Sequence, residues 1–166
     1  MMAQLKYGCT GLDHNLDSKL LYNAETWIHL SKTDIQKLEN VQNNFYKKLL
    51  GVPTGTPNIA IVEELGIMPM EHKIEVKKLL EFHRLLQMNS TRLPSKACAQ
   101  ARLLGARNVL DEGQRIMEKH NIQYDEEKVC DMTKNQRKRT VNHHIQTSVN
   151  ETIKRKSQEM KKLQIL

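Results

Sequence analysis

The sequence predicts an all-α protein, because three features recur along its length. Apolar residues return every three or four positions, which is the period of a helix that buries one face. Glycine and proline fall between these periodic stretches, where helices end and turns begin. No stretch alternates apolar and polar residues as a half-buried β-strand does. We therefore expect an irregular helical bundle that ends in a basic helix.

The first predicted helix follows a loose lead-in at residues 1–13 and covers about residues 15–30. Its apolar face is spaced by four, four and three positions and consists of Leu16, Leu20, Ala24 and Trp27.

The second predicted helix has the clearest periodicity in the chain. Ser31 or Thr33 can cap its start, and Ser31 with Asp34 forms a shorter-armed relative of the capping box. Gly51 ends it as a left-handed cap, and Pro53 prevents it from resuming. Its predicted apolar face is Ile35, Leu38, Val41, Phe45 and Leu49.

Two further helices complete the first predicted domain, which spans residues 14–90. Thr56 is the expected N-cap and Pro57 the first residue of a short helix that ends at Gly66. Pro69 starts a longer helix that runs to about Met88.

The remainder of the chain divides into a connecting region at residues 91–133 and a basic segment at residues 134–166. A polar linker at 89–95 precedes weaker helices near 96–104 and 109–120, and 121–132 is an expected acidic loop. The last predicted helix covers about 135–163, with a narrow apolar stripe of Val141, Ile145, Val149, Ile153, Met160 and Leu163.

The net charge of +7 is concentrated at the C-terminal end. Residues 1–133 contain 17 Lys and Arg against 17 Asp and Glu, whereas residues 134–166 contain nine against two. Such asymmetry favours a segment that faces a polyanion. Clustered cations bind phosphates through counterion release, which gives affinity without sequence choice. The alternatives are a solvated amphipathic helix and a nuclear-localisation patch.

The sequence offers no set of residues for a chemical step. It contains no metalloprotease, nucleophile-elbow or phosphate-loop motif. His143 and His144 are adjacent, so their side chains point about 100° apart on a helix and cannot act as a metal pair. We expect a non-enzymatic chain that has no catalytic residue, no metal and no cofactor.

Cysteine content and hydropathy indicate the cellular compartment of the protein. The three cysteines are far apart and odd in number, so a disulfide framework is not expected. No signal peptide opens the chain and no apolar run approaches about 18 residues. We expect an intracellular protein, nuclear or cytoplasmic, that is neither secreted nor inserted in a membrane.

Residues 14–90 resemble the region that follows the polymerase palm in reverse transcriptases of non-LTR (LINE-type) retrotransposons, and looser similarity extends to about His120. The matching residues are Leu21-Tyr22, Ala24-Glu25-Thr26-Trp27, Leu38-Glu39, Gln42, Leu49-Leu50-Gly51-Val52-Pro53, Thr56-Pro57, Glu64-Leu65-Gly66 and Pro69. In that family the region looks like the helical thumb, which grips the template–primer duplex. The resemblance implies a thumb-like bundle here, with Lys47 and Lys48 as candidate nucleic-acid contacts. Their alternative role is a solvated helix terminus, where cations favour the dipole.

The chain also departs from that family. A polymerase needs carboxylates at fixed spacing for two Mg²⁺ ions, yet this sequence has no Tyr-x-Asp-Asp turn, palm or fingers. The resemblance thus implies a non-catalytic fragment of an RNA-directed DNA polymerase that binds the backbone of RNA or DNA duplexes. The predicted contacts are Lys47, Lys48, Lys134, Arg137, Lys138, Arg139, Lys154, Arg155 and Lys156. The alternatives are a helical interaction module, which associates with a partner or itself through its C-terminal helix, and a remnant with no independent function.

Overall fold

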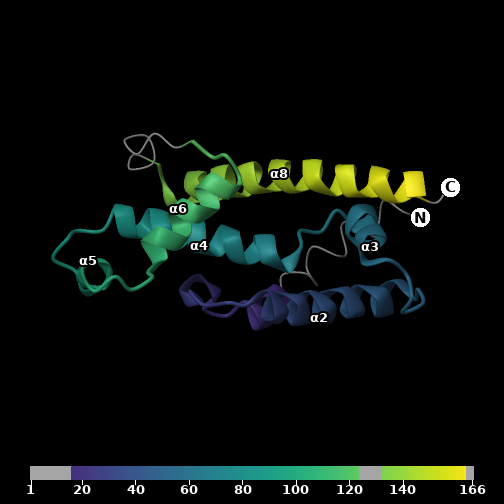
Figure 1. Ribbon diagram of the computed structural model, residues 1–166, viewed down its shortest axis with the longest axis horizontal. Coiled ribbons are helices and arrows are strands. Elements are labelled where there is room, and N and C mark those ends of the chain that lie inside the picture. Colours follow the sequence, from purple (N-terminus) through teal and green to yellow (C-terminus); the bar gives the residue numbers. More distant parts are fainter. Residues whose placement is uncertain (1–15, 124–131, 164–166) are drawn as a thin grey trace. The chain divides into compact units, whose positions relative to one another are not determined.

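The computed structural model describes residues 16–123 and 132–163. These residues form helices and contain no strand, which confirms the all-α prediction (Figure 1). The predicted lead-in at 1–13 lies outside the described residues, as do most of the expected loop at 121–132 and the side chains of Met160 and Leu163.

The first predicted helix is wrong over most of its length. Residues 16–20 are helical, a turn follows, and only a short 3-10 helix, η1 (Ala24–Thr26), occupies the remainder. The helix breaks at Asn23, whose φ of 57° is left-handed. The Asn23 carbonyl accepts hydrogen bonds from the backbone N–H and the hydroxyl of Thr26, at 3.1 and 2.9 Å. Asparagine tolerates this conformation and competes for backbone partners, which favours a turn.

Helix α2 (Lys32–Leu50) has the predicted ends. Ser31 is its N-cap, and a capping box joins Ser31 to Asp34 in both directions. Gly51 is left-handed, with φ 65°, and its N–H group bonds to carbonyls of the last helical turn. Side-chain capping at one end and a left-handed glycine at the other satisfy the backbone groups that a helix leaves open.

The buried face of α2 is different from the predicted one. Val41 and Leu49 are 47% and 41% exposed, and the buried residues of the helix are Gln42, Asn43, Tyr46 and Lys47. Two of these polar side chains reach backbone carbonyls: Gln42 Nε2 donates to Met68 O at 3.1 Å, and Lys47 Nζ donates to Thr54 O at 2.8 Å. Hydrogen bonding removes most of the penalty for burying such groups, so polar residues can share the buried face.

Helices α3 (Asn58–Leu65) and α4 (Met70–Leu86) follow as predicted, apart from one cap. Pro57 is the N-cap of α3, one residue later than expected, so Thr56 does not cap it. Gly66 ends α3 in the left-handed conformation.

The second half of the chain contains α5 (Leu93–Leu103), α6 (Val109–Lys119) and α8 (Lys134–Leu163). Pro94 lies in the first turn of α5, and Asn108 caps α6 by accepting from the N–H groups of Leu110 and Asp111. The bounds of α6 and α8 agree with the predicted ranges to within one residue.

The chain forms two compact units, and each combines distant stretches of sequence. The first unit is Met1–Tyr22, Leu30–His72 and Val149–Leu166; the second unit is Asn23–His29 and Lys73–Ser148. The core of the first unit is formed by Tyr46, Ile61, Val62 and Ile67, with Ile153 among the residues packed against it. Buried apolar residues of the second unit include Ile74, Leu79, Phe82, Leu85, Ile116, Val141 and Ile145.

Candidate nucleic-acid interface

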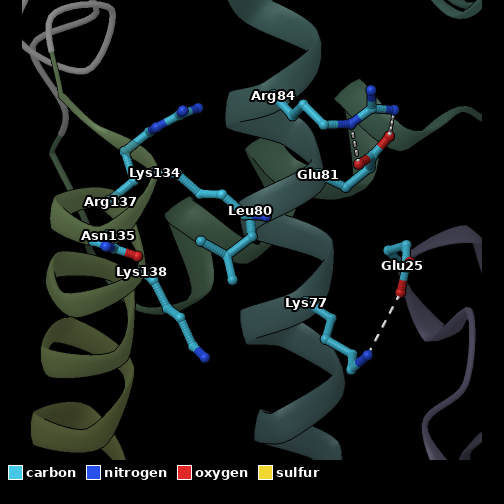
Figure 2. A pocket seen from close by; sticks show the side chains of 9 residues that line it. All are labelled: Glu25, Lys77, Leu80, Glu81, Arg84, Lys134, Asn135, Arg137 and Lys138. Carbon is cyan, nitrogen blue, oxygen red and sulfur yellow. Dashed lines mark hydrogen bonds and ion pairs between the residues drawn. The ribbon is translucent and has the colours of Figure 1, made fainter.

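A basic pocket of about 720 Å³ lies within the second unit and is lined by α4, η1 and the start of α8. Helix α8 contributes Lys134, Asn135, Arg137 and Lys138 to its lining. Helix α4 contributes Lys77, Leu80, Glu81 and Arg84, and η1 contributes Glu25 (Figure 2). Three of the nine predicted contacts are therefore brought to one pocket.

The residues at the start of α8 determine where the helix begins, and so where its first cationic side chains lie. The Thr133 hydroxyl accepts from Gln136 N–H at 3.3 Å, and Gln136 Oε1 accepts from Thr133 N–H at 2.9 Å. This reciprocal cap begins the helix at Lys134. The first turn contains no acidic residue, although negative charge is favoured at the positive end of a helix dipole. A bound phosphate would supply that missing charge.

The pocket has a positive excess. Among the residues that the structure describes, five cationic side chains and two carboxylates line it. Figure 2 shows both carboxylates already engaged: Glu25 with Lys77 at 3.8 Å, and Glu81 with Arg84 through bonds of 2.5 and 2.6 Å. Three positive charges remain, and they belong to Lys134, Arg137 and Lys138.

Arg137 is the inner member of this set. Its Nε is buried and makes no hydrogen bond within the described part of the chain. The nearby His83 does not add to the positive charge at neutral pH, because burial and the charge of Arg137 lower its pKa from 6.5 to about 4. A buried guanidinium N–H group without a partner is a donor that an anionic ligand can satisfy.

The other predicted contacts do not line this pocket. Arg139 is exposed in the second unit, and Lys154, Arg155 and Lys156 are exposed on the part of α8 that belongs to the first unit. Lys48 is exposed at the end of α2.

Lys47 lies inside the first unit. It is 7% exposed, and its amino group donates to the Thr54 carbonyl. It therefore links the turn after α2 to the end of that helix.

The sequence did not single out the α4 contribution. Lys77, Glu81 and Arg84 are spaced by four and three residues, so helical periodicity alone places them on one face. Their proximity to α8 depends on tertiary packing, which that spacing cannot show.

A second polar cluster of the second unit was also missed. Glu75 Oε1 accepts from Lys119 Nζ at 2.7 Å, Glu75 Oε2 lies 2.9 Å from His120 Nε2, and His120 Nδ1 lies 2.9 Å from Ser148 Oγ. Serine, histidine and carboxylate in series are the groups of nucleophilic catalysis. Here the carboxylate is shared with Lys119, and Ser148 lies within α8, where helix bonds occupy the backbone N–H groups that an oxyanion hole needs. We interpret the cluster as a polar tie between α4, α6 and α8.

Among the described residues, none of the helices has the length and apolar character needed to cross a bilayer. Comparison of the chain with protein-family models, with curated proteins and with solved structures gave no match.

Proposed function

We propose that this chain is a non-catalytic, thumb-like fragment of a retrotransposon reverse transcriptase that binds the phosphate backbone of nucleic acid. The observation that carries the binding proposal is the basic pocket, where Lys134, Arg137 and Lys138 leave an excess of three positive charges. The origin in a reverse transcriptase is supported by the resemblance of residues 14–90.

The residue types in the pocket favour backbone contacts over base recognition. The described part of its lining contains no aromatic side chain, and Leu80 is the one apolar residue there. Without a stacking platform, the lining offers cations and one amide, which suit phosphate oxygens. Binding should therefore depend steeply on salt and little on sequence.

The alternative role, a helical interaction module, needs an accessible apolar stripe on α8. The side chains of Val141, Ile145 and Val149 are 0%, 0% and 1% exposed. These residues already pack inside the chain, so the stripe offers no surface there to a partner helix. This observation favours nucleic-acid binding over the alternative.

The test is salt-titrated binding of the full chain to an RNA–DNA hybrid of mixed sequence. A triple variant, Lys134→Gln, Arg137→Gln and Lys138→Gln, removes the charge that carries the proposal. The slope of log K against log salt should fall by roughly two to three, because each phosphate contact contributes about 0.9. Deleting residues 134–166 would be a poor substitute, because it also removes the buried residues of α8.

A matched control removes three exposed lysines outside the pocket, through Lys19→Gln, Lys32→Gln and Lys96→Gln. This control changes the net charge equally and should retain most of the slope. Equal losses in the two variants would show a response to net charge alone, and an unchanged slope in the pocket variant would remove the pocket from the proposal.

For the origin, an upstream reading frame that encodes fingers and a Tyr-x-Asp-Asp palm is the expected genomic context.

A further inference from the structure

A smaller pocket of about 220 Å³ lies within the first unit and is lined by α2, α3, the start of α4 and the C-terminal half of α8. It shares no lining residue with the basic pocket. Its charge is opposite in sign, since Glu39 and Glu71 line it and Lys156 is the only lysine or arginine among the described residues of its lining. A ligand of this pocket would therefore differ from a phosphate.

An acceptor without a donor lies at this pocket. Asn43 is 5% exposed, and its Oδ1 is buried with no hydrogen-bond partner among the described residues. Its neighbour Gln42 shows the usual outcome, because the Gln42 amide donates to the Met68 carbonyl. A buried carbonyl oxygen that lacks a donor costs folding free energy, and a ligand with N–H groups would remove that cost.

Glu39 adds negative charge beside this acceptor. Burial raises the pKa of Glu39, and a hydrogen bond from the Glu71 backbone N–H lowers it. The charge of Glu71 raises this pKa further, whereas the charges of His72 and Lys156 lower it. A carboxylate has lone pairs for about four hydrogen bonds, so one backbone bond leaves capacity for a ligand. A cation placed here would relieve the repulsion between the two carboxylates.

The volume and the apolar lining of the pocket limit the size of its ligand and favour one with an apolar part. Ile59, Val62, Val149 and Ile153 line the pocket, and Val62 and Val149 are buried. The volume lies below the roughly 300 Å³ at which pockets accommodate drug-sized molecules. A bare metal ion would leave these apolar walls unused.

We propose that this pocket binds a small organic cation, an ammonium or amidinium group on a short alkyl chain, with Asn43 Oδ1 and the Glu39 carboxylate as its acceptors. The alkyl chain packs against the isoleucine and valine walls. The site is separate from the proposed nucleic-acid interface, so either proposal can fail without the other.

The test is an amide chemical-shift titration of the full ¹⁵N-labelled chain with 1-butylammonium chloride. The uncharged probe 1-butanol has the same chain length and serves as the matched ligand. We expect saturable shifts at α2 and at the C-terminal half of α8, with binding of the ammonium at least roughly tenfold tighter than that of the alcohol.

Variants of matched shape locate the site. Glu39→Gln should weaken ammonium binding roughly tenfold, because it removes the charge and keeps the side-chain shape. Asn43→Asp should tighten binding, because it adds a charge at the acceptor. The control Glu64→Gln changes an exposed glutamate of α3 outside the pocket and should bind like the wild type. If Glu39→Gln fails to fold by circular dichroism, Lys156→Gln at the exposed rim replaces it and should tighten binding.

Four results would overturn the proposal. They are no saturable shift with the ammonium, equal affinity for 1-butanol, the same loss in Glu39→Gln and Glu64→Gln, and shifts of these amides by MgCl₂ that the ammonium does not reproduce.

Discussion

At the scale of a single residue, the buried imidazole of His83 couples the stability of the second unit to pH. Burial and the charge of Arg137 lower its pKa from 6.5 to about 4. Below pH 6.5 the unfolded chain therefore takes up a proton that the folded chain does not. The contribution of His83 is complete above pH 6.5 and is lost as the pH falls toward 4, by roughly 3 kcal/mol in all. His83→Leu should abolish this dependence of the free energy of unfolding on pH, measured by urea unfolding between about pH 7.5 and pH 5.

The exposed His143 provides the control for this prediction. His143→Gln should retain the wild-type loss of stability on acidification. A His83→Leu variant that loses as much stability between the two pH values as the wild type would show that other groups carry the effect.

Lys47 shows why a residue's role could not be predicted from its position at a helix end. A cation in the last turn of a helix favours the dipole and usually extends into solvent. The Lys47 amino group instead donates to the Thr54 carbonyl, which the turn after Gly51 brings within reach. That turn was predicted from Gly51 and Pro53, but the direction of one carbonyl within it depends on backbone angles that residue types do not specify.

At the scale of an element, the contact between α6 and α4 depends on a glycine inside a helix. Gly113 is buried in α6, and a Cβ built there would lie 2.7 Å from Phe82 Cβ and closer still to its ring. At an open helix position, Gly→Ala stabilises by about 1 kcal/mol. Here the clash outweighs that gain. Gly113→Ala should therefore lower the free energy of unfolding, measured in urea, by about 1–3 kcal/mol.

A second substitution separates this clash from other causes. Phe82→Ala removes the ring and the Cγ atom, so Gly113→Ala should cost less in that background, and the double-mutant cycle should show coupling between the two positions. The exposed neighbour Gln114→Ala should have little effect. Additive losses at Gly113 and Phe82 would contradict the proposed contact.

Most helix ends could be predicted because their signals are local. Ser31 with Asp34 and the left-handed Gly51 determine the ends of α2 from a few adjacent residues. The break at Asn23 was missed, because apolar spacing from Leu16 to Trp27 continues through it. The buried face of α2 was also missed, because periodicity counts apolar residues and cannot foresee that Gln42 finds a carbonyl acceptor.

At the scale of the whole molecule, the candidate interface was predictable only in the part that one helix supplies. Lys134, Arg137 and Lys138 fall within five residues, so a charge count finds them. Their α4 partners Lys77 and Arg84 lie about 50 residues earlier in a stretch of zero net charge, and only the packing of α4 and α8 in the second unit unites them.

Helix α8 supplies buried residues to both units, so a truncation within this helix should destabilise one unit and spare the other. Val141 and Ile145 belong to the second unit, whereas Val149 and Ile153 belong to the first, where Ile153 packs against the Tyr46 cluster. A chain that ends at Ser148 keeps the whole of the second unit and loses part of the first. In hydrogen exchange, α2 and α3 should therefore lose protection while α6 keeps it, since protection follows the stability of each cooperative unit. Equal loss of protection in α6 would show that the two units unfold as one.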